Sequence, residues 1–193
     1  GQTGPFHVCM VYADVYEVGQ PNLGLAILYN ALNKVPDISC ERAYLPWKDM
    51  CALLRQHNIP LLSLEGAAPL ASFDVVGFTL AHEMIATNIL ETLDLAGIPL
   101  TSELRDEEDP YLFAGGPSVW NSEPISCVFD AILLGDGEEA LVEMCECVRV
   151  GKLEGISRQE MLLRLSCIQG VYVPSLYDVV YDDSSTRWGY AVP

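Results

Sequence analysis

One short apolar run carries the clearest structural signal near the start of this sequence: His7-Val8-Cys9-Met10-Val11-Tyr12-Ala13. Its length and its density of apolar side chains are typical of a strand that is buried on both faces. Runs of the same kind follow at residues 40–45, 73–80, 111–114 and 131–134. Segments of helical periodicity lie between or after them, at residues 21–35, 46–57, 84–96 and 138–150.

Strands that alternate with helices and lack a polar face indicate a parallel sheet covered by helices on both sides. The predicted fold is α/β, a flavodoxin-like or Rossmann-like doubly wound sheet of five mainly parallel strands. We expect this domain to span residues 6–152. Residues 153–193 are predicted to form a short C-terminal extension, a helix followed by extended segments or a hairpin. The acidic stretch at residues 102–109 is expected to be a solvent-exposed loop.

The charge of the chain restricts its partners. It has 27 acidic and 10 basic residues, which gives a formal net charge of -17. Nucleic-acid binding requires basic side chains that neutralise phosphates, so we expect no nucleic-acid partner. An anionic membrane surface would repel the chain, and no apolar run approaches the roughly 20 residues of a membrane-spanning helix. We therefore expect no membrane partner either.

The cysteines are seven in number, and none forms a Cys-x-x-Cys pair. An odd count without a regular framework is typical of reduced, mostly buried thiols, and it predicts a cytoplasmic location. Structural zinc is disfavoured for the same reason.

Parallel sheets of this kind bind ligands beyond the carboxyl ends of their strands. In this sequence the segments at those ends are residues 14–24, 79–83, 115–120 and 135–139. Two of them are rich in glycine, Gly115-Gly116-Pro117 and Gly135-Asp136-Gly137. Such glycines often do no more than permit tight turns. At two neighbouring strand ends they also predict an open floor without side chains, where a broad flat ligand can lie.

A nucleotide phosphate fits these segments poorly. The first contains neither Gly-x-Gly-x-x-Gly nor a Walker lysine. The helix after Gly137 begins with Glu138 and Glu139, and their carboxylates repel a phosphate. A neutral ligand rich in amide and hydroxyl donors fits better. Glu83 and Asp136 complete a set of four carboxylates, but adjacent glutamates on a helix diverge, so we expect no metal site there.

The first of these segments contains Asp14-Val15-Tyr16-Glu17-Val18-Gly19. This frame resembles the Asp-x-His-x-x-Gly of cobalamin-binding domains, in which the histidine coordinates cobalt from below. Tyr16 stands at the histidine position, and a phenol is a poor neutral donor to cobalt. Thr79 lies where such domains place a serine, and Gly115-Gly116 matches their later glycine pair. The resemblance implies a cobalamin site without a histidine lower ligand; alternatively, Tyr16 packs the loop.

A wider resemblance extends from about His7 to Tyr181, to the N-terminal region of a group of radical SAM proteins. It rests on residues 14–19, 22–25, 93–99, 114–117, 135–138 and 170–177. It implies a cobalamin-binding-like domain ahead of a catalytic barrel that cleaves S-adenosylmethionine with a 4Fe-4S cluster. The cluster motif Cys-x-x-x-Cys-x-x-Cys does not occur in this sequence. The cluster and S-adenosylmethionine are therefore expected in a barrel beyond Pro193, and we expect no catalytic residue in this chain.

The residues expected to contact cobalamin come from all four segments: Asp14, Tyr16, Gly19, Asn22, Gly24, Thr79, Leu80, His82, Gly115, Gly116, Pro117, Gly135, Asp136, Gly137 and Glu138. Trp47 and Trp120 are expected to pack in the core or in loops rather than to form a stacking platform. Two other functions stay open: a domain that has lost the cofactor and serves in docking or substrate presentation, and a carrier of flavin. The expected partners are the protein's own radical SAM barrel and a second copy of the chain, bound through the apolar extension.

Overall fold

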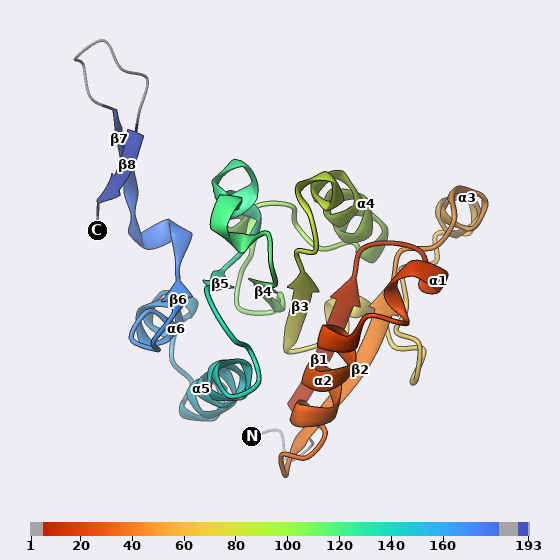
Figure 1. Cartoon of the computed structure of the whole chain (residues 1–193). Coiled ribbons are helices and arrows are strands. Elements are labelled where there is room, and N and C mark those ends of the chain that lie inside the picture. The colour runs from red at the N-terminus through yellow and green to blue at the C-terminus, as the bar shows by residue number, and fades with distance from the viewer. Residues whose placement is uncertain (1–5, 182–188, 193) are drawn as a thin grey trace.

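The computed structural model describes residues 6–181 and 189–192, and its main sheet has strands in the order β2-β1-β3-β4-β5-β6 (Figure 1). Five strands are parallel: β1 (Phe6–Tyr12), β2 (Ile38–Tyr44), β3 (Val75–Thr79), β4 (Tyr111–Gly115) and β5 (Ala131–Leu133). The sixth, β6 (Val171–Tyr172), pairs antiparallel with β5. The predicted α/β, doubly wound, mainly parallel fold is confirmed, and the C-terminal extension adds one strand to it.

Helices cover both faces of this sheet (Figure 1). They are α1 (Tyr16–Gly19), α2 (Leu23–Leu32), α3 (Lys48–His57), α4 (Ala86–Ala96), α5 (Ala140–Glu154) and α6 (Arg158–Leu165). The pair α2 and α5 lies on one face, and the pair α3 and α4 lies on the other. None of the helices in the described part of the chain is long and apolar enough to cross a membrane.

Local sequence explains where several of these helices begin and end. The Asn22 side-chain oxygen accepts a hydrogen bond from the Leu25 N–H at 2.8 Å and caps α2. Ser157 caps α6 in the same way through the Glu160 N–H. Gly97 ends α4 in the left-handed conformation, with φ of 70°, as its position after an apolar run predicts.

The structure differs from the predicted elements in three places. The helix expected from Glu138 begins at Ala140, because the Gly-Asp-Gly turn continues for two more residues. The helix expected from residue 84 begins with a 3-10 turn, η2 (Glu83–Ile85). After β6, the extended segment becomes β7 (Asp178–Tyr181), which pairs with β8 (Gly189–Val192) in a separate two-stranded sheet. The division of the chain at residue 152 stays a prediction.

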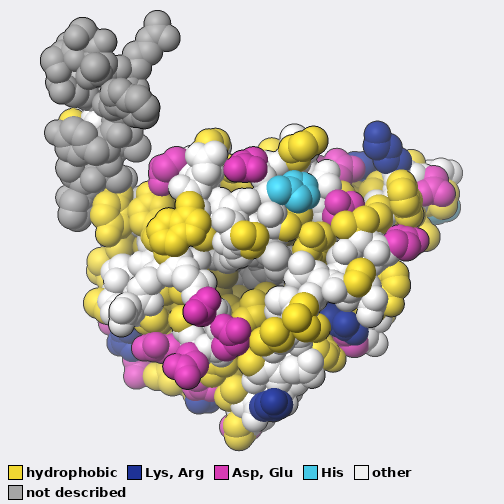
Figure 2. All heavy atoms as spheres, viewed as in Figure 1, with side chains coloured by type: hydrophobic (Ala, Val, Ile, Leu, Met, Phe, Trp, Pro, Cys, Tyr) yellow, Lys and Arg dark blue, Asp and Glu magenta, His cyan; other side chains and the backbone are white. Residues whose placement is uncertain are grey.

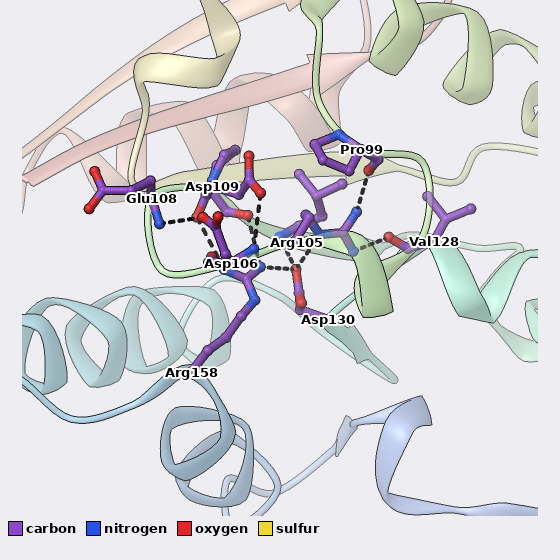
Figure 3. Close-up of polar contacts among 10 residues, drawn as sticks. Pro99, Arg105, Asp106, Glu108, Asp109, Val128, Asp130 and Arg158 are labelled. Carbon is purple, nitrogen blue, oxygen red and sulfur yellow. Dashed lines mark hydrogen bonds and ion pairs between the residues drawn. The ribbon is translucent and has the colours of Figure 1, made fainter.

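A buried ionic cluster joins α6 to the amino ends of β4 and β5 (Figure 3). Asp130 and Arg105 have side chains with no exposed area, and Arg158 is almost as deeply buried. The Asp130 carboxylate accepts hydrogen bonds from Arg158 Nη2 at 2.9 Å and from the Leu112 N–H at 2.7 Å. Arg105 Nε lies 3.3 Å from the same carboxylate oxygen.

Backbone carbonyls complete the coordination of the two guanidinium groups in this cluster. Arg158 donates to the carbonyls of Asp106, Asp109 and Pro110, as Figure 3 shows in part. Arg105 donates to those of Pro99 and Val128. Burial lowers the pKa of Arg105, and the attraction of Asp130 opposes that change. The prediction that residues 102–109 form a solvent-exposed acidic loop is confirmed for Glu103, Asp106, Glu107 and Glu108, which are exposed. The prediction did not include the buried Arg105, nor the carbonyls of this segment that hold Arg158.

Candidate functional site

A cavity of about 580 Å³ lies at the carboxyl ends of the parallel strands, between the sheet and helices α2 and α5. We call this cavity the slot. From the sheet it is lined by Met10 of β1, Gly77 of β3 and Phe113 of β4, and from α5 by Leu141 and Met144. The strand order reverses between β1 and β3, and the slot spans that point. In open parallel sheets this is where ligands bind.

The slot opens on the face of the molecule drawn in Figure 2, which has a hollow near its centre. Acidic side chains gather below and to the left of this hollow, on the side of α5, and hydrophobic side chains lie at several places around it. The acidic lining residues are Asp136 and Glu138, which follow β5. The mouth of the slot thus offers carboxylate acceptors beside apolar walls.

Glycines leave part of the slot without side chains. A Cβ built on Gly115, at the end of β4, would meet no atom within 4 Å, and the same is true of Gly135 after β5. Gly135 and Gly116 both have a positive φ, +122° and +114°, but a Cβ on Gly116 would also lie 3.0 Å from the Leu80 carbonyl oxygen. Only glycine suits that position. The two glycine turns therefore border one cavity, and the backbone of both faces open space.

Most of the predicted site residues line the slot. They are Asn22, Gly24, Thr79, Gly115, Gly116, Pro117, Gly135, Asp136, Gly137 and Glu138. The remaining predicted residues do not line it: Asp14, Tyr16, Gly19, Leu80 and His82. The predicted segments at residues 79–83, 115–120 and 135–139 thus border the slot, together with the end of the segment at residues 14–24.

Residues 14–19 include the short helix α1, which packs against the edge of the sheet at Tyr44 of β2. The Tyr16 ring stands edge-on against the Tyr44 ring, with centroids 5.2 Å apart. A Cβ on Gly19 would lie 2.7 Å from Tyr44 Cδ1 and 2.9 Å from Tyr12 Cδ1, so this position requires glycine for packing. Asp14 accepts a hydrogen bond from the Val15 N–H at 2.7 Å. Each of the three framing residues therefore has a local structural role.

Tyr16 faces a second cavity of about 540 Å³, which we call the side groove. Tyr44, Trp47, Met50 and Leu64 line the side groove together with Tyr16. It lies beside α1, α3 and the end of β2, and no residue lines both cavities. Tyr16 thus borders the side groove and not the slot.

Leu80 and His82 follow β3 without entering the slot. Leu80 is buried, and its backbone binds the glycine turn: its N–H donates to Gly115 O at 2.7 Å, and its carbonyl accepts from Ser118 N–H at 3.0 Å. His82 is exposed at the start of η2, and its side chain forms no capping hydrogen bond. Among the described residues, no group of three or more His, Cys, Asp or Glu side chains is placed to hold a metal ion.

Trp120 also lines the slot. It ends one of the predicted segments, residues 115–120, but was not among the residues expected to contact the ligand. The prediction that Trp47 and Trp120 pack in the core or in loops is wrong, because their exposed fractions are 61% and 79%. The 3-10 helix η4 (Val119–Asn121) instead buries Val119 and turns the indole of Trp120 outward. A signal was available in the sequence, since Trp120 follows directly on the glycine turn at 115–117.

All seven cysteines lie in the described part of the chain and are free thiols. The prediction that most are buried is confirmed for Cys9, Cys40, Cys51 and Cys145, whereas Cys127 and Cys167 are exposed. Burial raises the pKa of Cys40 to about 12, which keeps this thiol protonated and unreactive.

No curated protein was found to be significantly similar to the chain. Residues 24–174, more than three quarters of the chain, match the sequence model of a family described as "Radical SAM proteins, N-terminal". The matched range begins at Gly24 at the slot and includes every slot residue that follows it. The chain therefore belongs to the family of N-terminal regions of radical SAM proteins.

Proposed function

We propose that this domain binds cobalamin at the slot and presents it to the radical SAM barrel of the same protein. The observation that carries the proposal is the slot itself, a cavity of about 580 Å³ at the strand ends, bordered by two glycine turns. Its volume is within the range of about 300–1,000 Å³ that is typical of small-molecule sites. The chain supplies binding and orientation, and the parent protein supplies the catalytic residues.

The chemistry of the lining fits different parts of this cofactor. The slot is too small for the whole cofactor but suits a flat heteroaromatic base such as that of its nucleotide tail. The apolar walls from Met10, Phe113 and Met144 favour such a ring. The carboxylates of Asp136 and Glu138 can accept hydrogen bonds from the amide groups around the corrin. These carboxylates repel the phosphate of the tail, so the proposal places the phosphate away from Asp136 and Glu138.

The lower face of the corrin would have no imidazole from this domain. None of the residues that line the slot is a histidine, and Tyr16 lies in the side groove. When bound, cobalamin supplies methyl transfer or one-electron chemistry, for which the protein sets the position and excludes water. The family assignment adds S-adenosylmethionine and a 4Fe-4S cluster to the proposal for the parent protein.

The test uses the purified chain, hydroxocobalamin, a desalting column and the visible spectrum of the eluted protein. We expect the wild type to retain the cofactor at about one equivalent. Gly115→Leu should weaken binding by at least about tenfold, because its side chain enters the open space at the slot. The matched control is Ala52→Leu, which places the same side chain on an exposed position of α3 away from both cavities.

Two results would contradict the proposal. One is a colourless wild-type protein after exposure to excess hydroxocobalamin. The other is equal retention by the wild type and by a folded Gly115→Leu variant, which would place the cofactor elsewhere.

Docking without a cofactor is the second candidate function. Leu23, Met84 and Trp120 are large hydrophobic residues with most of their surface exposed, and all three follow strand ends on the slot side. Such residues favour contact with another domain. A wild type that binds the barrel but no cobalamin would support this function and overturn the first.

A further inference from the structure

The indole of Trp120 is the largest exposed apolar group that lines the slot. Its exposed fraction is 79%, and it belongs to η4, directly after the glycine turn. Exposed aromatic surface of this size is costly in water and is common where a ligand or partner covers it. Trp47 is also exposed, but it lies in the side groove.

The segment that carries Trp120 is held firmly by its neighbours. Val119 is only 3% exposed and anchors η4 in the core. The Ser118 N–H donates to the Leu80 carbonyl at 3.0 Å, and the Val119 N–H donates to the Gly116 carbonyl at 3.3 Å. The backbone at Trp120 is therefore tied to the same turn that borders the slot. An aromatic residue on such a backbone loses little conformational entropy when a ligand packs on it.

Two surfaces of different character thus lie next to each other at the slot. Gly115 offers backbone with open space above it, and Trp120 offers a large flat aromatic face. An open backbone and an indole face each favour contact with a flat conjugated ring, whereas a saturated or branched group gains less from the aromatic face.

We propose that Trp120 stacks on the planar base of the nucleotide tail as the tail enters the slot, and so selects for ligands that carry such a ring. This inference rests on the proposed function, because it takes cobalamin as the ligand. Trp120 acts here as a positioning residue with no part in bond making or breaking.

The experiment compares hydroxocobalamin with the corresponding cobinamide, which has the corrin ring but no nucleotide tail. Equilibrium dialysis with visible absorbance gives both affinities for the wild type, Trp120→Ala, Trp120→Phe and the matched control Trp47→Ala. Stacking of a base on an aromatic side chain predicts that Trp120→Ala weakens cobalamin binding about tenfold. Trp120→Phe should keep most of the affinity, and Trp47→Ala should keep all of it. Cobinamide should bind equally well to the wild type and to Trp120→Ala.

The possible results separate this inference from the proposed function. Wild-type protein that binds no cobalamin overturns both. Wild-type binding together with unchanged binding by Trp120→Ala overturns only the role of Trp120. An equal loss of cobalamin and cobinamide binding in Trp120→Ala also overturns it, because the indole would then contact the corrin rather than the base.

Discussion

Replacing Asp130 by asparagine tests whether the buried ionic cluster holds α6 and the acidic segment on the sheet. Asp130 is the carboxylate shared by Arg105 and Arg158, and none of its side-chain area is exposed. The substitution keeps the size of the side chain and keeps an acceptor for the Leu112 N–H, which donates to Asp130 at 2.7 Å. It removes the negative charge that compensates two buried guanidinium groups.

The expected loss of stability follows from the cost of an uncompensated buried charge. Removing one partner of a buried ion pair costs about 3–5 kcal/mol. With an m value of about 2 kcal/mol/M, the urea midpoint should fall by roughly 1.5–2.5 M. In a domain of this size each kcal/mol corresponds to about 2–4 °C, so the melting temperature should fall by about 6–20 °C.

Urea titration followed by far-UV circular dichroism measures this change, with m compared between variants. Arg158→Met should destabilise the protein less, because Asp130 keeps Arg105 as its ionic partner. The groups that lose a donor are the Asp130 carboxylate and the carbonyls of Asp106, Asp109 and Pro110. Arg55→Met is the control: its ion pairs with Glu91 and Asp94 are exposed, so its midpoint should stay near that of the wild type. An Asp130→Asn variant within about 1 kcal/mol of the wild type would refute the assigned role of the cluster.

Three further predictions concern the glycine turn, the thiols and the extension. Gly116→Ala should cost about 1–3 kcal/mol in chemical unfolding, because its φ of +114° strains any side-chain-bearing residue; an unchanged midpoint would show that the turn adapts. A short pulse of iodoacetamide on the native protein should label Cys127 and Cys167 first and leave Cys145 unmodified, as read by peptide mass spectrometry. Early labelling of Cys145 would contradict its burial. Self-association through the extension at residues 153–193 predicts a dimer by light scattering at high concentration, and a monomer there would contradict it.

The sheet could be predicted because strands buried on both faces appear as dense apolar runs. In β1 every residue from Val8 to Tyr12 is buried. The apolar run at residues 7–13 therefore predicts this buried strand directly. The strand β6 was not expected in the sheet, because its two residues join by antiparallel pairing with β5. A pairing of that length depends on tertiary contacts and leaves no period in the sequence.

The slot could be predicted in part, because the ends of parallel strands meet at one edge of a sheet. Thr79, Gly115 and Gly135 come together for this reason. Tyr16 follows β1 at the same edge, but α1 turns its ring toward Tyr44, and no local pattern gives that direction. The pairing of Arg158 with Asp130 joins residues far apart in sequence, so composition suggested only a solvated acidic loop.

A structure of the chain with hydroxocobalamin bound is the most direct test of the ligand site. The account predicts the nucleotide tail between the sheet and helices α2 and α5, with its base against Gly115 and Trp120. Cofactor bound in the side groove beside Tyr16, or an empty slot at saturating cofactor, would contradict it.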